Sequence, residues 1–170
     1  MNRVPTDLRF MMAEMVVKKP MKFKSFVDTG KINWFWLSQN PAAVDILETN
    51  PDKINGIQLS INLTATHLIE KNLDKIYWPW LSENPAAIHL LEKNPDKIYW
   101  NWLSANPAAI HLLEKNPDKI DWWMLSKNPA AINLIEKNLD KINWICLSGN
   151  PAAIHLLERN PDKSTGKYYL

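Results

Sequence analysis

The sequence has a single cysteine, few glycines and no long apolar run, and these shortages exclude several classes of protein. The lone Cys146 excludes an intramolecular disulfide framework and is typical of a reducing compartment. No apolar run is long enough to span a bilayer. Asp7, Arg9 and Glu14 interrupt any secretory hydrophobic segment near the start. We therefore expect an intracellular protein that is not secreted and has no membrane segment.

Most of the chain also lacks an excess of charge of either sign. Residues 1–30 hold six basic and three acidic side chains, a net charge of +3, whereas the remainder holds fourteen basic and fifteen acidic side chains, a net charge of −1. Nucleic-acid-binding proteins usually carry a basic stripe. The charge pattern therefore disfavours nucleic acid as the partner of residues 31–170.

Signatures of catalysis and cofactor binding are absent as well. The chain contains no Gly-rich phosphate loop, no H-E-x-x-H, no C-x-x-C and no G-x-S-x-G. We therefore predict that the protein is not an enzyme, and that it has no catalytic residues, no cofactor and no metal site.

The chain is rich in tryptophan (nine) and proline (twelve), and similar residues recur along it at a fixed spacing. Aligned with itself at a shift of 22 residues, it divides into six similar units followed by the start of a seventh. Apolar positions that recur in every unit must stack against the next unit, because a unit this small cannot bury its apolar face alone. We predict an N-terminal cap over residues 1–29, a repeat array over 30–163 with units 30–51, 52–73, 74–95, 96–117, 118–139 and 140–161, and a C-terminal tail over 164–170.

The second half of each unit has the features of a short helix. In residues 106–116, Asn106 is a favoured N-cap, Pro107 suits the first helical position, and Lys115 lies in the last turn. Asn116 suits a left-handed residue that ends the helix. The following Asn-Pro-Asp-Lys has the residues that a type I turn prefers.

The first half of each unit, Ile-x-Trp-x-x-Leu-Ser, is ambiguous between helix and strand. If the residue before the Trp position is an N-cap, four of six units carry Asn or Asp there, and Pro79 falls in the first turn, where it is tolerated. The fold prediction is therefore all-α: an α-solenoid of six turn–helix–helix repeats, with an N-terminal capping helix over residues 6–17. The alternative is a β/α solenoid like the leucine-rich repeats, because Ile98, Trp100 and Trp102 also alternate as in a strand.

The string NPAAIHLLEKNPDKIxWxxLSxNP resembles the 22-residue tandem repeats of uncharacterised proteins from giant nucleocytoplasmic large DNA viruses. The resemblance covers residues 30–163. It implies a viral repeat protein in the host cytoplasm or the virion, and it implies no activity.

Two columns of the repeat, each the set of residues at one position in successive units, suggest functional interpretations that the spacing does not favour. The Trp column is too regular for a binding platform and indicates core packing; Gly56, which breaks it, predicts a gap or a weak joint unless a neighbour fills the space. A histidine column (His67, His89, His111, His155) is interpreted as a solvated face, because stacked units are about 10 Å apart and neighbouring histidines cannot share one zinc ion.

Three other columns vary between units and include large apolar residues, a pattern that indicates either a partner-binding surface or simple drift at solvent-exposed positions. The first hypothesis is a non-enzymatic scaffold that binds a protein or peptide along these columns. The second hypothesis is an array that binds RNA or single-stranded nucleic acid, one unit per base. The candidate partner-binding residues are Trp36, Trp80, Trp102, Trp123, Asn101, Glu83 and Lys127.

Overall fold

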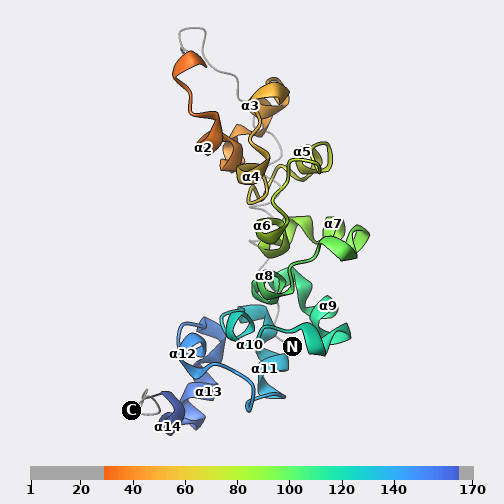
Figure 1. Ribbon diagram of the computed structural model, residues 1–170. Helices are drawn as coiled ribbons and strands as arrows, with labels where there is room; N and C mark the ends of the chain where they lie inside the picture. The colour runs from red at the N-terminus through yellow and green to blue at the C-terminus, as the bar shows by residue number, and fades with distance from the viewer. Residues whose placement is uncertain (1–28, 165–170) are drawn as a thin grey trace, which may run out of the picture.

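The computed structural model describes residues 29–164, and every regular element in that range is helical (Figure 1). The helices are short, and they stack along the chain into an elongated array. The α-solenoid prediction is confirmed, and the β/α alternative is wrong for the described range. The predicted capping helix over residues 6–17 and most of the predicted tail lie outside the described residues.

The first helix of each unit lies in one row along the array (Figure 1). These helices are four to six residues long, too short to persist alone in water, so stacking must supply their stability. None of the described helices is long and apolar enough to cross a bilayer. The row consists of α2 (Trp34–Gln39), α4 (Gly56–Leu59), α6 (Trp78–Glu83), α8 (Trp100–Ala105), α10 (Trp122–Leu125) and α12 (Trp144–Leu147).

The second helices form a neighbouring row, and most begin with a 3₁₀ turn at Pro-Ala-Ala. The α-helical parts are α3 (Val44–Glu48), α5 (Thr66–Glu70), α7 (Ile88–Lys93), α9 (Ile110–Lys115), α11 (Ile132–Glu136) and α13 (Ile154–Arg159). The 3₁₀ turns before them are η3 (Pro41–Ala43), η5 (Pro85–Ala87), η7 (Pro107–Ala109), η9 (Pro129–Ala131) and η10 (Pro151–Ala153). Between units lie η2 (Thr29–Lys31), η4 (Pro51–Lys53), η6 (Pro95–Lys97) and η8 (Pro117–Lys119), and α14 (Pro161–Ser164) begins the seventh unit.

The predicted N-caps of the first helices are confirmed. The side chains of Asn33, Asn55, Asp121 and Asn143 each accept a hydrogen bond from the backbone N–H three residues ahead. Pro79 lies in the first turn of α6, as expected. Local capping of this kind starts each helix at a fixed place in the unit.

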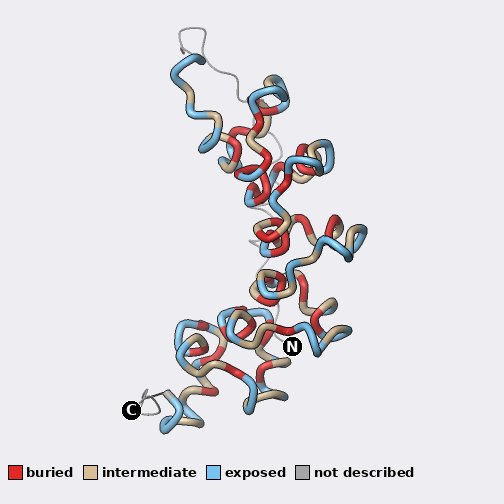
Figure 2. Tube along the Cα trace, viewed as in Figure 1, coloured by how far each residue is buried: buried red, intermediate tan, exposed pale blue. Residues whose placement is uncertain are grey.

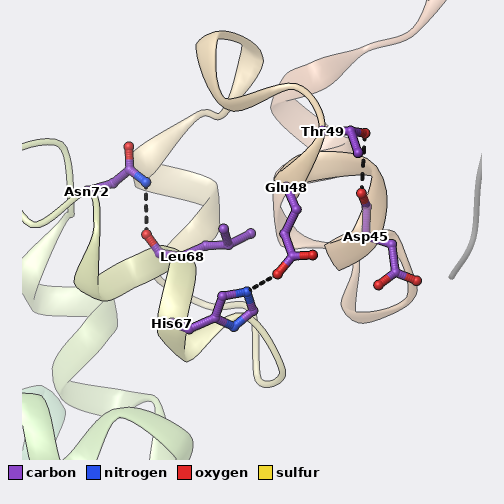
Figure 3. Close-up of polar contacts among 6 residues, drawn as sticks. All are labelled: Asp45, Glu48, Thr49, His67, Leu68 and Asn72. Atoms are coloured by element: carbon purple, nitrogen blue, oxygen red, sulfur yellow. Dashed lines mark hydrogen bonds and ion pairs between the residues drawn. The ribbon is translucent and has the colours of Figure 1, made fainter.

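The left-handed backbone conformation predicted for the asparagine that ends the second helix is wrong. Asn116 has φ −134° and ψ 62°, which is not the left-handed conformation. Its side chain instead donates to the carbonyl of Leu112, 2.9 Å away, and so satisfies one of the carbonyls that a helix end leaves open. The equivalent Asn72 makes the same bond to Leu68 (Figure 3).

The core repeats with the units, and Figure 2 shows buried residues along the whole array. Five leucines of the first helices are fully buried, and so are five of the six alanines that end the Pro-Ala-Ala segment or, in the second unit, its Leu-Thr-Ala equivalent. The Trp column is half-buried and packs against this core, which confirms its predicted structural role. The fully buried leucines are Leu59, Leu81, Leu103, Leu125 and Leu147.

A serine hydroxyl in each of the first five units joins that unit to the next. Ser104 Oγ donates to the carbonyl of Trp100, 2.8 Å away, and accepts from the backbone N–H of Asp121 in the following unit, 3.0 Å away. The same two bonds occur at Ser38, Ser60, Ser82 and Ser126. Each of these serines is fully buried.

An asparagine in each of the second to sixth units adds a second link, to the preceding unit. Asn128 Oδ1 accepts from the N–H of Ala130 and starts η9, and its Nδ2 donates to the carbonyls of Ser104 and Asn106, each 3.1 Å away. Those carbonyls lie at the C-terminal end of α8. One buried amide therefore caps its own unit's turn and the end of the preceding unit's first helix. Asn62, Asn84, Asn106 and Asn150 do the same with the preceding serine carbonyl at 2.9–3.0 Å.

Replacing Ser104 with alanine tests the hydroxyl link. We expect Ser104→Ala to lower the free energy of unfolding by about 1–3 kcal/mol, because it leaves the Asp121 N–H without its acceptor. Ser148→Ala is the matched control: Ser148 makes the same bond to the carbonyl of Trp144 but is exposed and accepts no hydrogen bond from another described residue. Equal losses in urea denaturation of the two variants would contradict the inter-unit role.

The space left by Gly56 is filled by the backbone of the next unit. A Cβ atom at Gly56 would lie 2.3 Å from the carbonyl oxygen of Lys75. In later units the equivalent lysines lie over the indole at this position: Lys119 Nζ is 4.9 Å from the Trp100 ring, and Lys141 Nζ is 5.1 Å from the Trp122 ring. In the second unit the Lys75 backbone moves into the space that an indole takes elsewhere.

Candidate functional site

The candidate site is a set of positions on the first-helix row, which we call the variable face; all but the buried Gln58 and Pro79 are exposed or half-buried. It consists of three positions per unit that differ from unit to unit, and all seven predicted partner-binding residues belong to it. Two of the positions belong to the first helices themselves, and the third falls at or just beyond their C-terminal ends. The three positions are occupied by Phe35, Ile57, Pro79, Asn101, Trp123 and Ile145; by Trp36, Gln58, Trp80, Trp102, Met124 and Cys146; and by Gln39, Ile61, Glu83, Ala105, Lys127 and Gly149.

Most of the predicted residues on this face are accessible. Trp36 and Trp123 are 58% and 51% exposed, and Asn101, Glu83 and Lys127 are exposed. Trp80 and Trp102 are half-buried, so only part of each indole is available to a partner. Exposed tryptophan is uncommon on a surface that binds nothing, because Trp contributes strongly to binding energy and costs hydrophobic free energy when left in water.

The structure brings four of the seven predicted residues together, in two pairs, and it does not bring Trp36, Trp102 or Asn101 to another of them. Lys127 Nζ lies 3.3 Å from the centroid of the Trp123 ring, a cation–π contact that holds the indole against the surface of the fifth unit. Trp80 and Glu83 line one pocket of about 180 Å³, together with Ile61, Leu63, Asn84 and Pro85. The second and third units therefore form a small apolar pocket, whereas Trp123 with Lys127 is a separate feature.

Two tyrosines at the N-cap position of the first helices extend the variable face, and the sequence did not lead us to predict them. Tyr77 and Tyr99 are 44% and 49% exposed, and the Tyr77 ring packs edge-on against Trp80 with the centroids 5.3 Å apart. They occupy the N-cap position but make no side-chain cap. The signal was available in the sequence: an aromatic residue where other units keep Asn or Asp cannot serve the capping role.

On the second-helix row, histidine side chains pair with glutamate side chains of the preceding unit. His67 Nε2 lies 2.5 Å from a carboxylate oxygen of Glu48 in the preceding unit (Figure 3). His89, His111 and His155 pair in the same way with Glu70, Glu92 and Glu136. The side chains are about two-fifths exposed, as a solvated face predicts, but their pairing with the glutamate column was missed.

Metal-ligand and charge clusters do not define a further site in the described range. Among residues 29–164, no group of three or more His, Cys, Asp or Glu side chains is arranged to hold a metal ion. A hydrogen bond from the Lys53 ammonium, 3.1 Å away, lowers the pKa of Asp52, but this is an exposed pair within one turn. Cys146 is half-buried on the variable face.

A groove along the fourth unit, lined also by residues of the third and fifth units, combines an indole with lysines. It has a volume of about 370 Å³, and its lining includes Trp100, Lys115, Lys119, Asn116 and Glu92. The equivalent positions in the next unit hold Trp122, Lys137 and Lys141, so the same residue types recur along the array.

The fold and the repeated inter-unit hydrogen bonds define a tandem helical-repeat protein of the α-solenoid class. No protein-family model matches the chain, and no curated protein and no solved structure is similar enough to be counted a relative.

Proposed function

We propose that this protein is a non-enzymatic scaffold that binds a protein or peptide through the variable face. The observation that carries the proposal is the exposure of aromatic side chains at positions that differ between units: Trp36, Tyr77, Tyr99 and Trp123 are 44–58% exposed. Tyr and Trp are the residues that contribute most to protein–protein affinity.

The division between fixed and variable positions supports a partner-binding role over random drift. The Leu, Ser and Asn columns that stay fixed lie mostly in the core or the inter-unit hydrogen bonds. Drift at solvent-facing positions favours polar residues, which do not associate nonspecifically. The variable face instead retains Trp123, Ile57 and Ile145, each more than two-fifths exposed.

The test compares two double variants in affinity capture from an extract of the source cells. Tyr99→Ser with Trp123→Ser removes aromatic groups from the variable face, and Lys93→Ser with Glu114→Ser makes equally exposed changes on the second-helix row. We expect a partner captured by the wild type to be lost with the first variant, at least about 30-fold weaker, and retained with the second. Far-UV circular dichroism confirms that both variants stay folded.

The same capture has outcomes that reject the proposal. If both double variants retain every protein that the wild type captures, the variable face is not the binding surface. If the Lys93→Ser, Glu114→Ser variant loses the partner and the aromatic variant keeps it, the binding surface is the second-helix row.

Binding of single-stranded RNA is the second candidate, and the groove beside Trp100 favours it. Lys119 and Lys141 each lie beside an indole in successive units, an arrangement that suits stacked bases with nearby phosphates. Glu92 lines the same groove, and residues 31–170 have a net charge of −1, which opposes a polyanion. RNA titrations over a salt series separate the candidates, because phosphate contacts make affinity fall steeply with salt.

The resemblance of the repeat to giant-virus sequences supports a viral setting for this function. Under this proposal the partner is an intracellular protein of the infected cell or of the virion.

A further inference from the structure

The apolar pocket between the second and third units arises where the second unit departs from the repeat. The other five units have proline as the first residue of the 3₁₀ turn, whereas the second unit has Leu63, which is 53% exposed. Ile61 stands where the other units have a polar, charged or small residue, and it is 37% exposed. Both side chains line the pocket. These two exposed apolar side chains therefore belong to this junction and not to the repeated core.

The packing of the second unit on the first does not depend on these two apolar side chains. Asn62 Nδ2 still donates to the carbonyls of Ser38 and Asn40, at 3.0 and 3.1 Å. Thr64 Oγ1 donates to the carbonyl of Pro41, 2.9 Å away, a bond that the alanine of the other units cannot make. Apolar groups left in water cost hydrophobic free energy. Their place in the lining of a pocket therefore favours a binding role.

The third unit supplies an aromatic wall and a carboxylate. Trp80 is half-buried, and the Tyr77 ring packs edge-on against it with the centroids 5.3 Å apart, which supports the indole from the side. Asn84 is buried, and both ends of its amide are bonded within the array. Glu83 is exposed, and its carboxylate has no ion pair or hydrogen bond with another residue of the described range. Glu83 is therefore the polar group of this lining that a ligand can pair with.

The size and the charge of the pocket together define its occupant. A volume of about 180 Å³ is smaller than the roughly 300–1,000 Å³ of a small-molecule site, and it suits one apolar side chain. The Glu83 carboxylate attracts a cation, and a lysine or arginine beside the apolar group can pair with it while staying in contact with water. The pocket therefore fits an apolar side chain next to a basic one.

We propose that this pocket is the anchor subsite of the variable face and that it takes a linear segment of the partner protein. The segment carries one Leu, Ile, Met or Phe with a Lys or Arg within two residues of it. The apolar side chain lies against Ile61, Leu63 and Trp80, and the cation pairs with Glu83. Residues of an extended segment are about 3.3 Å apart, so this spacing reaches from the pocket to its carboxylate. The inference rests on the proposed function and narrows the partner to one with a short apolar–basic motif.

A second copy of this chain is the weaker choice of occupant. Trp123 and Lys127 present an apolar group beside a cation, which is the chemistry that the pocket fits. The Lys127 ammonium, however, already lies 3.3 Å from the centroid of the Trp123 ring in its own unit. A contact between the pocket of one copy and the fifth unit of another would also be heterologous. Such a contact leaves an open end on each copy and builds filaments unless the rotation between copies closes a ring.

Selection from a phage-displayed library of random linear peptides, with the full chain as bait, tests the subsite. Fluorescence anisotropy of the labelled synthetic peptides then measures affinity. Ile61→Gln with Leu63→Pro gives the pocket the residues of the first unit, and proline removes no hydrogen bond because the Leu63 N–H has no acceptor among residues 29–164. We expect the selected peptides to combine an apolar residue with Lys or Arg, and to bind this double variant at least about tenfold more weakly.

A charge exchange tests the carboxylate independently of the proline variant. We expect Glu83→Lys to weaken binding of the selected peptides at least about threefold, and to bind more tightly the same peptides with their Lys or Arg replaced by Glu. Glu114→Lys makes the same change at an exposed position of the second-helix row and should leave both affinities unchanged. Far-UV circular dichroism confirms that the variants stay folded.

The outcomes separate this inference from the proposed function. Peptides that bind the Ile61→Gln, Leu63→Pro variant as well as the wild type, but lose affinity for Tyr99→Ser, Trp123→Ser, would overturn the subsite and support the variable face. Acidic motifs, or no effect of Glu83→Lys, would overturn the inference through its charge. Selection of no peptide would overturn the linear segment and leave the capture experiment to decide the proposed function. Self-association in analytical ultracentrifugation that the pocket variant abolishes would identify a second copy as the occupant and would also overturn the inference.

Discussion

Asn128→Ala is expected to lower the free energy of unfolding by about 2–4 kcal/mol, a large share of the stability of an ordinary domain. Asn128 is 1% exposed. Its loss leaves the buried carbonyl of Ser104 without a partner and removes the side-chain cap on the N–H of Ala130, whereas the Asn106 carbonyl keeps its bond from the Ala109 N–H. Each buried group left unsatisfied costs about 1–3 kcal/mol, and a lost N-cap costs about 1 kcal/mol.

The matched control is Asn138→Ala in the same unit. Asn138 is half-buried, and its Nδ2 makes one bond, to the carbonyl of Leu134, 2.9 Å away. We expect a loss of about 1 kcal/mol there. Chemical denaturation followed by far-UV circular dichroism measures both variants. Comparable losses would show that the inter-unit amide contributes no more than a local cap.

Gly56→Trp, which restores the residue that the repeat predicts, is expected to destabilise the array. The column holds Trp in every other unit, so the repeat pattern alone predicts a stabilised protein. The Lys75 backbone occupies that space, with its carbonyl oxygen 2.3 Å and its Cβ 2.5 Å from the position of a first side-chain carbon. Even Gly56→Ala should cost about 1–3 kcal/mol, because backbone must move, and the indole should cost more.

Gly149→Ala controls for the general effect of replacing glycine. A Cβ there would meet only the carbonyl oxygen of Cys146, at an ordinary 3.6 Å. We expect a change within about 0.5 kcal/mol or a slight gain, since alanine restricts the unfolded chain. Thermal and urea unfolding measure all three variants. A more stable Gly56→Trp protein would mean that the second and third units separate easily enough to admit an indole.

Much of the fold follows from local patterns in the sequence. The 22-residue period is visible directly as the recurrence of residues in the sequence. The Asn N-caps at Asn33 and Asn106 and the first-turn position of Pro79 depend on residues within about one helical turn of one another. Helix starts are governed by such short-range bonds, so they can be predicted from one unit. The recurrence of apolar columns likewise required that units stack.

Part of the candidate site was also predictable, because positions that vary between units are ones that the core packing and the inter-unit hydrogen bonds do not require to be fixed. That reasoning found Trp36 and Trp123, which are exposed, but it gave Trp80 and Trp102 the same weight although they are half-buried. The exposure of a side chain depends on the rotation between units, which no single unit specifies.

Only the tertiary structure decided how the units hold one another. Ser104 reaches Asp121 across 17 residues, and Asn128 reaches Ser104 across 24, distances in sequence over which no local rule applies. The histidine column likewise paired with glutamates 19 residues earlier, and Lys75 filled the space at Gly56. The sequence by itself determined where each helix begins and that the units stack; the packing of one unit on the next determined which polar groups meet, because that packing sets the superhelical rotation between them.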